Sequence, residues 1–137
     1  MRILAVDPGD KQIGIALSDP TGTIANPLTV LKHIQRAIDA ATIAQLATEN
    51  AAGQIIVGAT YDPEGNLTPQ GRKGARLAKA IQAQTTLPVT LWDESGSTQT
   101  ARRARVELGL SRKRRAGHFD ALAATVILQT YLDSRHP

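Results

Sequence analysis

Three short apolar runs separated by turn-forming residues open the chain and predict three β-strands. The first run covers residues 2–6 and ends at an Asp-Pro-Gly-Asp cluster, and the second covers residues 12–17. Because only a short turn separates them, these two runs predict a β-hairpin. Residues 23–30 supply a third strand, and Pro27 within it favours a position at the edge of a sheet.

Helical and strand-like patterns alternate over the rest of the chain. A helix is predicted over residues 34–50, a buried strand over 55–57, a second helix after the loop at 59–69, a fifth strand over 87–92, and two more helices over about 97–108 and from about 119 onward. The apolar side chains that repeat at helical spacing are Ile34, Ala37, Ile38, Ala41 and Ala44 in the first helix, Leu77, Ala80 and Ile81 in the second, and Ala123, Val126, Ile127 and Thr130 in the last.

This order of elements predicts an α/β fold. Strands joined by short turns pair antiparallel, whereas strands separated by helices pair in parallel through right-handed crossovers. We therefore expect a mixed five-stranded sheet, its first three strands antiparallel and its later strands parallel, with helices on both faces. A length of 137 residues without a repeat or a linker predicts one domain, residues 1–137.

Composition excludes several classes of protein. The chain has no cysteine, which rules out disulfides, thiolate metal sites and cysteine nucleophiles. No apolar run approaches the roughly 20 residues that cross a bilayer, and the first residues lack the basic and apolar pattern of a signal peptide. We expect a soluble, cytoplasmic protein without a membrane partner.

Positive charge is concentrated in one segment. Residues 102–115 hold seven of the sixteen basic residues and one acid, Glu107, while the remaining chain has more acidic than basic residues. The seven are Arg102, Arg103, Arg105, Arg112, Lys113, Arg114 and Arg115. Such a run favours a polyanionic partner, RNA or branched DNA, because guanidinium groups that meet phosphates release counterions. A solvated basic loop is the alternative.

Four acidic residues lie at the ends of predicted elements. Asp7 ends the first strand, Asp93 and Glu94 end the fifth, and Asp120 opens the last helix. Strand carboxyl ends gather at one sheet edge, and carboxylates that met there would repel one another unless a divalent cation lay between them. That chemistry indicates Mg²⁺, with Mn²⁺ as a substitute. Each acid alone also fits a structural role, in a turn, a solvated loop or the first turn of a helix.

Four blocks of the sequence, taken together, resemble a known family. The opening block is Asp7-x-Gly9-x-Lys11-x-Ile13-Gly14-Ile15-Ala16-x-Ser18-Asp19-Pro20, followed by Ile56-Val57-Gly58 with the Gly65 loop, Leu91-Trp92-Asp93-Glu94 with Ser97-Thr98, and Asp120-x-x-Ala123-Ala124-x-x-Ile127-Leu128. In this order they resemble the YqgF/RuvX group of Holliday-junction resolvases, also described as pre-16S ribosomal RNA nucleases. The likeness covers nearly the whole chain.

The resemblance implies a ribonuclease H-like fold and a metal-dependent nuclease, active in pre-16S rRNA 5′-end processing, Holliday-junction resolution or both. The catalytic, metal-binding acids would be Asp7, Glu94 and Asp120. The nucleic acid would contact Lys11, Thr98, Arg102, Arg103, Arg112, Lys113, Arg114 and Arg115. The chain would act as a monomer or a homodimer.

The chain also departs from the family pattern. Ser95-Gly96 stands where the family usually has Arg-Leu, and Gln12 stands where Arg is frequent. Loss of a loop arginine removes a rigid charged fork suited to phosphate. A nucleic-acid-binding module of the same fold with little cleavage activity is therefore an alternative. An actin-like ATP-binding protein, which also begins with Asp-x-Gly on a hairpin, is a third reading, although that architecture normally needs two such domains.

Overall fold

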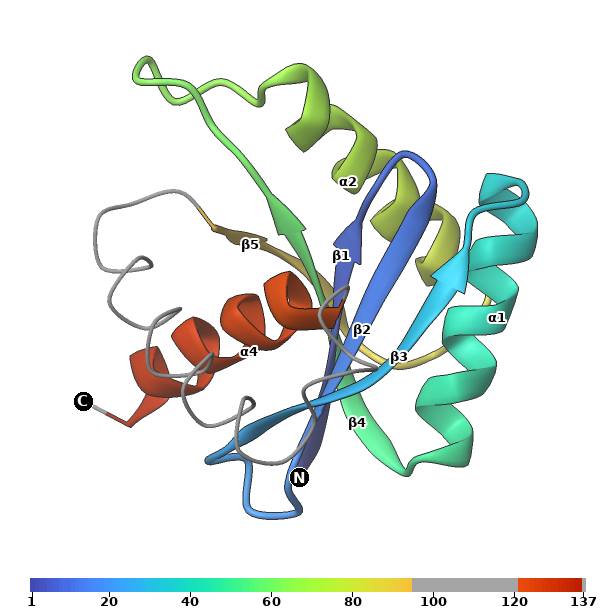
Figure 1. Cartoon of the computed structure of the whole chain (residues 1–137), viewed down its shortest axis with the longest axis vertical. Helices are drawn as coiled ribbons and strands as arrows, with labels where there is room; N and C mark the ends of the chain where they lie inside the picture. Colours follow the sequence, from blue (N-terminus) through green and yellow to red (C-terminus); the bar gives the residue numbers. More distant parts are fainter. Residues whose placement is uncertain (95–120, 137) are drawn as a thin grey trace.

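The computed structural model describes residues 1–94 and 121–136 and contains one five-stranded sheet between helices (Figure 1). The strands are β1 (Arg2–Pro8), β2 (Gln12–Ser18), β3 (Ala25–Lys32), β4 (Ala52–Ala59) and β5 (Val89–Asp93), and the helices are α1 (Arg36–Glu49), α2 (Pro69–Gln82) and α4 (Leu122–Arg135). Each of these three helices has 14 residues, and no helix in the described part of the chain is long and apolar enough to cross a membrane.

The strands lie in the order β3-β2-β1-β4-β5. β1 pairs antiparallel with β2, and β2 pairs antiparallel with β3, whereas β1 pairs parallel with β4 and β4 parallel with β5. The predicted mixed sheet is confirmed. Pro27 lies in β3, the edge strand of the sheet. A residue without an N–H group is tolerated there because no further strand pairs with the outer side of β3.

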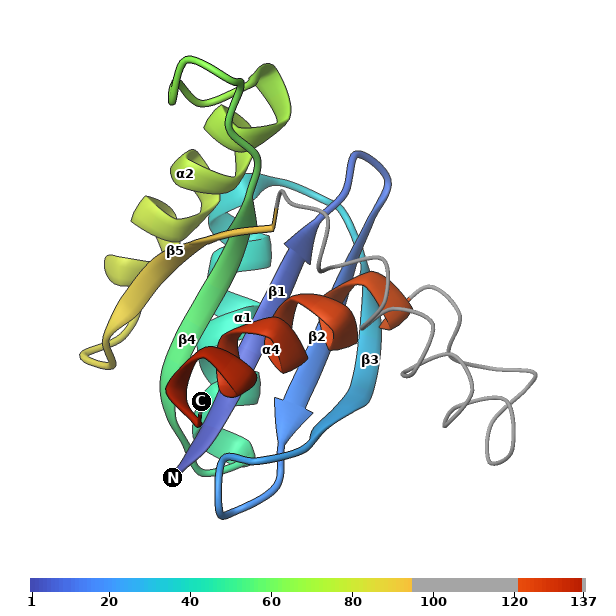
Figure 2. The ribbon, with the colours of Figure 1, turned by 90° about the vertical axis from the view of Figure 1, so that its left-hand side faces the viewer.

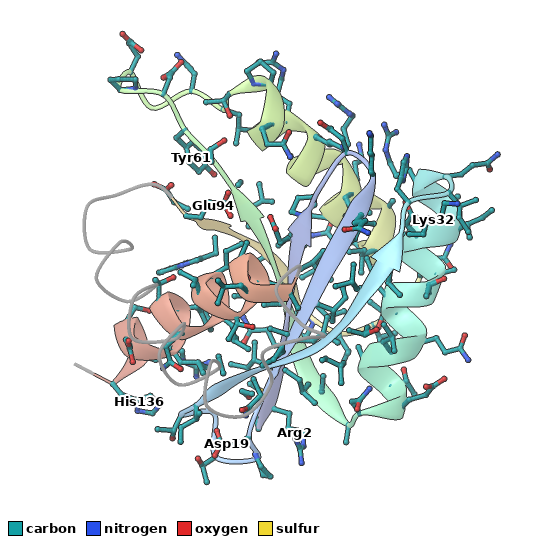
Figure 3. All side chains as sticks on the ribbon, viewed as in Figure 1. Arg2, Asp19, Lys32, Tyr61, Glu94 and His136 are labelled. Carbon is teal, nitrogen blue, oxygen red and sulfur yellow. The ribbon has the colours of Figure 1, made fainter. Side chains whose placement is uncertain are left out.

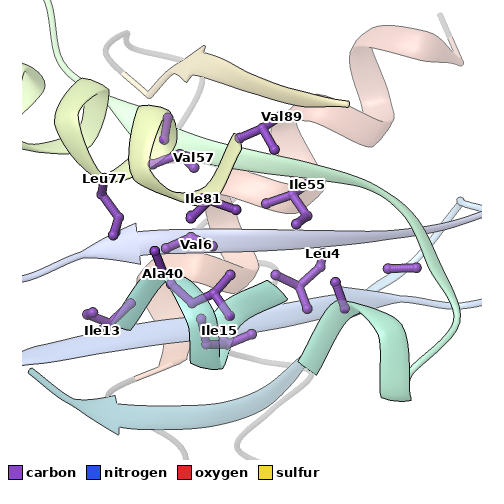
Figure 4. Close-up of a cluster of buried hydrophobic side chains, with 14 of the residues drawn as sticks. Leu4, Val6, Ile13, Ile15, Ala40, Ile55, Val57, Leu77, Ile81 and Val89 are labelled. Carbon is purple, nitrogen blue, oxygen red and sulfur yellow. The ribbon is translucent and has the colours of Figure 1, made fainter. Parts of the chain in front are cut away.

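α1 and α2 cover one face of the sheet and enclose the larger core cluster (Figure 4). Alternation along the strands sends Leu4 and Val6 of β1 and Ile55 and Val57 of β4 to this face, where all four are fully buried. Ile81 of α2 closes the cluster from the helix side. Burial of these branched side chains fixes the register of the central strands, because a slip by one residue would expose them.

α4 covers the opposite face (Figure 2). It packs Ala124, Ile127 and Leu128 onto Ile3 of β1 and Ile56 of β4, which alternate with the residues of the first cluster. The sheet is therefore the middle layer of three. Residues that alternate along one strand face α1 and α2 on one side and α4 on the other, so the two faces can present different side chains at the same strand end.

The buried face of α1 differs from the apolar repeat in the sequence. Ile34 precedes the helix and is 62% exposed, and Ile38 is 44% exposed. Ala44 is buried as predicted, and the other apolar residues of the buried stripe are Ala40, Ile43 and Ala47. Small alanines let α1 approach the sheet closely, so side-chain size rather than hydrophobicity alone determined the face. The helix predicted over 97–108 lies outside the described residues.

Candidate active site

Asp7 lies near the carboxyl end of β1 on the face covered by α4. Ile3 and Ala5 pack in the α4-side cluster, and strand alternation places Asp7 on the same face, where it is half-buried. The residue paired with it on β2 is Gly14. On the other side, Gly58 of β4 follows the Val6–Val57 pair by one step. Two glycines therefore flank Asp7 across the sheet.

Glu94 reaches the same face from the end of β5. Its backbone N–H donates to the carbonyl oxygen of Ala59 at 3.0 Å, which continues the pairing of β4 with β5 by one residue. A β-carbon added to Gly58 would lie 2.4 Å from Oε2 of Glu94 and 2.7 Å from Cδ1 of Ile127. The Glu94 carboxyl group thus occupies the space that the missing side chain of Gly58 leaves under α4.

Electrostatics shows that the acids interact at this edge. Burial, together with the negative charges of Asp7 and Asp93, raises the pKa of Glu94 to about 7. The structure therefore brings Asp7 and Glu94 together from β1 and β5, two strands separated by β4. A charged Glu94 in this position is costly without a compensating positive charge.

This pKa shift predicts a pH-dependent stability. Between pH 4.5 and pH 7 the folded chain holds a proton on Glu94 that the unfolded chain has released, so the free energy of unfolding falls as the pH rises through this window. Without divalent cations, Glu94→Gln is expected to raise the Tm at pH 8 by about 3 °C, since a partly exposed group contributes only about 1 kcal/mol. The difference should vanish near pH 4.

The same measurement tests cation binding. Mg²⁺ is expected to raise the Tm of the wild type at pH 8 and to raise that of Glu94→Gln much less, because a ligand stabilises the state that binds it. Glu49→Gln, at an exposed position in α1, is the matched control and should behave as the wild type. Equal Mg²⁺ effects on the wild type and Glu94→Gln would contradict a cation site at Glu94.

The turn after Asp7 is held from the other side of the sheet by α2. Gln70 Nε2 donates to the carbonyl oxygen of Pro8 at 2.6 Å, and Lys73 Nζ donates to that of Gly9 at 2.9 Å and pairs with the Asp10 carboxylate. Gly74 lets α2 lie against β4, since a β-carbon there would be 2.6 Å from the carbonyl oxygen of Gly58. α2 therefore fixes the backbone of the turn that follows Asp7 and the backbone of β4 at Gly58, next to Glu94.

The other predicted site residues divide into two groups. Lys11 is exposed in the β1–β2 turn, and its carbonyl oxygen accepts the N–H of His33. The remaining ones lie outside the described residues, namely Thr98, Arg102, Arg103, Arg112, Lys113, Arg114, Arg115 and Asp120. Sequence reasoning missed the contributions of Gln70, Lys73 and Gly58, because each depends on how α2 or Glu94 packs against a strand end.

The donor set fits a hard divalent cation. Asp7 and Glu94 offer carboxylate oxygens, which Mg²⁺ and Mn²⁺ prefer, and their mutual repulsion would be relieved by a cation between them. Within residues 1–94 and 121–136, no group of three or more His, Asp or Glu side chains is placed to hold a metal ion.

Comparison with known proteins identifies similar chains over the full length. The family model of RuvX, described as a Holliday junction resolvase, matches residues 1–134. A protein of Thermoanaerobacter pseudethanolicus named "Putative pre-16S rRNA nuclease" is 43% identical over 136 residues, 98% of either chain. A protein of Moorella thermoacetica with the same name is 41% identical over 133 residues, covering 97% of this chain and 95% of the relative.

Solved structures share the fold at low sequence identity. RuvC of T. thermophilus in complex with a Holliday junction substrate has a TM-score of 0.67 at 15% identity, covering 99% of this chain and 96% of that one. The fowlpox virus Holliday junction resolvase has a TM-score of 0.57 at 18% identity, covering 98% and 99%. These similarities confirm the predicted ribonuclease H-like architecture.

Proposed function

The chain belongs to the RuvX family of Holliday junction resolvases, and from this premise we propose that it is a nuclease that hydrolyses phosphodiester bonds in structured nucleic acid with a divalent cation. The observation that carries the proposal is the electrostatic interaction of two carboxylates, Asp7 and Glu94, at the carboxyl edge of the sheet, where the Glu94 carboxyl group lies over Gly58.

Asp7 and Glu94 would hold Mg²⁺ or Mn²⁺, together with Asp120 from the segment before α4. A bound cation of this kind supplies Lewis acidity for phosphodiester hydrolysis. The chain itself supplies rigid placement. Asp7 is on a central strand whose following turn is bonded to α2, and Glu94 is confined between β4 and Ile127. Ligands held in this way keep their geometry when substrate binds.

Glu94 can also handle a proton. With a pKa of about 7 in the absence of a cation, its carboxyl group exchanges protons near neutral pH, which is the range in which general acids and bases work best. A cation beside Glu94 would lower that pKa and favour the carboxylate. The carboxylate form is the one that can act as a ligand.

The substrate is proposed from the relatives. Similar chains carry names that refer to pre-16S rRNA and to Holliday junctions, so precursor ribosomal RNA and four-way DNA are the two substrates to compare. Lys11 and the predicted basic and hydroxyl residues, Thr98, Arg102, Arg103, Arg112, Lys113, Arg114 and Arg115, would contact the phosphates. Both substrates present the same phosphodiester chemistry to the acid pair.

A cleavage panel tests the proposal. The purified chain is incubated with structured precursor rRNA, single-stranded DNA and a four-way DNA junction, each with Mg²⁺, with Mn²⁺ and with a chelator. We expect cleavage of at least one structured substrate, slower cleavage of single-stranded DNA and no cleavage with the chelator. Binding of structured nucleic acid without single-turnover cleavage under either metal would instead identify a binding module of this fold.

A further inference from the structure

We propose that the pocket between the β1–β2 turn, α1 and α2 binds a phosphate of the nucleic-acid strand at a distance from the cleaved bond. This inference rests on the proposed nuclease function and extends the substrate contact to the face of the sheet opposite α4. The pocket has a volume of about 620 Å³. Its lining includes Gly9 and Asp10 from the turn, His33 from the connection between β3 and α1, Arg36 at the start of α1, and Arg76 of α2.

The hydrogen bonds and ion pairs in this pocket leave two guanidinium groups without a side-chain partner among the described residues. The Asp10 carboxylate is paired with Lys73, which lowers the pKa of Asp10. The Asp39 carboxylate, in a side chain that is 4% exposed, bonds His33 Nδ1 at 2.5 Å and accepts the N–H of Ile34.

Both acids are therefore already satisfied. Neither Arg36 nor Arg76 has a side-chain hydrogen bond or an ion pair with another residue in the described part of the chain. Two such groups facing one pocket are suited to a phosphate, which accepts hydrogen bonds from several N–H donors at once.

The distribution of charge favours a strand of nucleic acid over a small anion. Residues 1–94 contain eight lysines and arginines, and all except Arg2 lie in the β1–β2 turn, at the end of β3, at the start of α1 or in α2. Figure 3 shows Lys32 on this side of the molecule, away from Arg2 and from Glu94. A polymer with regularly spaced phosphates can use a surface of this extent, whereas a single anion needs only the pocket.

The β1–β2 turn connects this pocket to the acid pair. Asp7 faces α4, whereas Gly9, two residues later, lines the pocket on the α1–α2 side, and exposed Lys11 lies at the tip between the two faces. A strand that leaves Asp7 and Glu94 around this tip meets Lys11 first and Arg36 and Arg76 next. The pocket then contacts a phosphate several nucleotides from the cleaved bond.

The test compares substrates of graded length. The variant with both Arg36→Gln and Arg76→Gln is assayed on the shortest oligonucleotide that the wild type cleaves and on progressively longer ones. We expect KM to rise about tenfold on long substrates, with the rise absent on the shortest, and kcat to change little. The salt dependence of binding to a long single strand should weaken by a slope of about 1.4, for two lost phosphate contacts.

A matched control removes the same charge elsewhere. The combination Arg2→Gln and Arg135→Gln affects two cations that lie neither in the pocket nor on the basic surface of the β1–β2 turn, β3, α1 and α2, and it should not reproduce the length-dependent rise in KM. An Arg36→Gln and Arg76→Gln variant with the wild-type KM and salt slope on long substrates overturns the inference while leaving the proposed nuclease in place. If the wild type cleaves none of the substrates, the proposed function itself is contradicted.

A metal-free binding experiment separates the two sources of phosphate. Amide chemical shifts of Gly9 and Arg36 are followed by NMR during titration with orthophosphate and, separately, with a long oligonucleotide. If the oligonucleotide shifts these amides at a much lower concentration than orthophosphate does, the result supports binding of a nucleic-acid strand in the pocket. Tight binding of orthophosphate that the oligonucleotide does not displace would identify a small-anion site and overturn the inference.

Discussion

Replacement of Asp7 by Asn is expected to lower the cleavage rate by at least about a thousandfold without unfolding the chain. Asparagine keeps the shape of the side chain and removes the charge that would hold a cation. The substitution also removes a negative charge that raises the pKa of Glu94, so the Tm in metal-free buffer should be equal to or higher than that of the wild type. The measurement is single-turnover cleavage with saturating Mg²⁺, together with thermal unfolding.

If Asp7→Asn loses activity but keeps its stability, Asp7 is a functional acid rather than a structural turn residue. Asp7 precedes Pro8 and Gly9, so a purely structural Asp7 would show lower stability and a proportional loss of activity on substitution. Glu49→Gln changes the charge equally at an exposed helix position and should cleave at the wild-type rate. If Asp7→Asn cleaves as fast as the wild type and still needs Mg²⁺, the acid pair is not the catalytic centre.

The sequence alone accounts for much of the architecture. The antiparallel and parallel pairings followed from the lengths of the connections, because a short turn can join only antiparallel neighbours. The meeting of Asp7 with Glu94 also followed, since both end strands that run toward the same sheet edge. Their roles as cation ligands stay a prediction, as does the role of Asp120.

Tertiary packing decided what the sequence left open. The buried face of α1 depends on close approach of alanines to the sheet, which a hydrophobic repeat does not register. Gln70 and Lys73 bond backbone carbonyls about 60 positions earlier in the chain, and no local pattern marks such partners. Arg36 and Arg76 belong to different helices, so the pocket that they share exists only once α1 and α2 have packed side by side.

Gly58→Ala is expected to lower the cleavage rate by about a hundredfold, through Glu94 rather than through direct contact with substrate. The added methyl group would lie 2.4 Å from Oε2 of Glu94 and 2.7 Å from Cδ1 of Ile127, distances at which one side chain or the other has to move. Overpacking of this kind lowers the free energy of unfolding by about 1–3 kcal/mol. Cleavage is therefore measured at a temperature at which the variant is fully folded.

A double-mutant cycle separates the displacement of Glu94 from general destabilisation. In a Glu94→Gln background the catalytic charge is already absent, so Gly58→Ala should reduce cleavage little further while it still lowers the Tm. Ala47→Val, which overpacks a fully buried position of α1 in the core cluster on the face of the sheet opposite α4, should lower the Tm without a comparable loss of cleavage. If Gly58→Ala cleaves at the wild-type rate when folded, the position of Glu94 over that glycine has no catalytic importance. If its loss of cleavage is equal with and without Glu94→Gln, the glycine acts through another group.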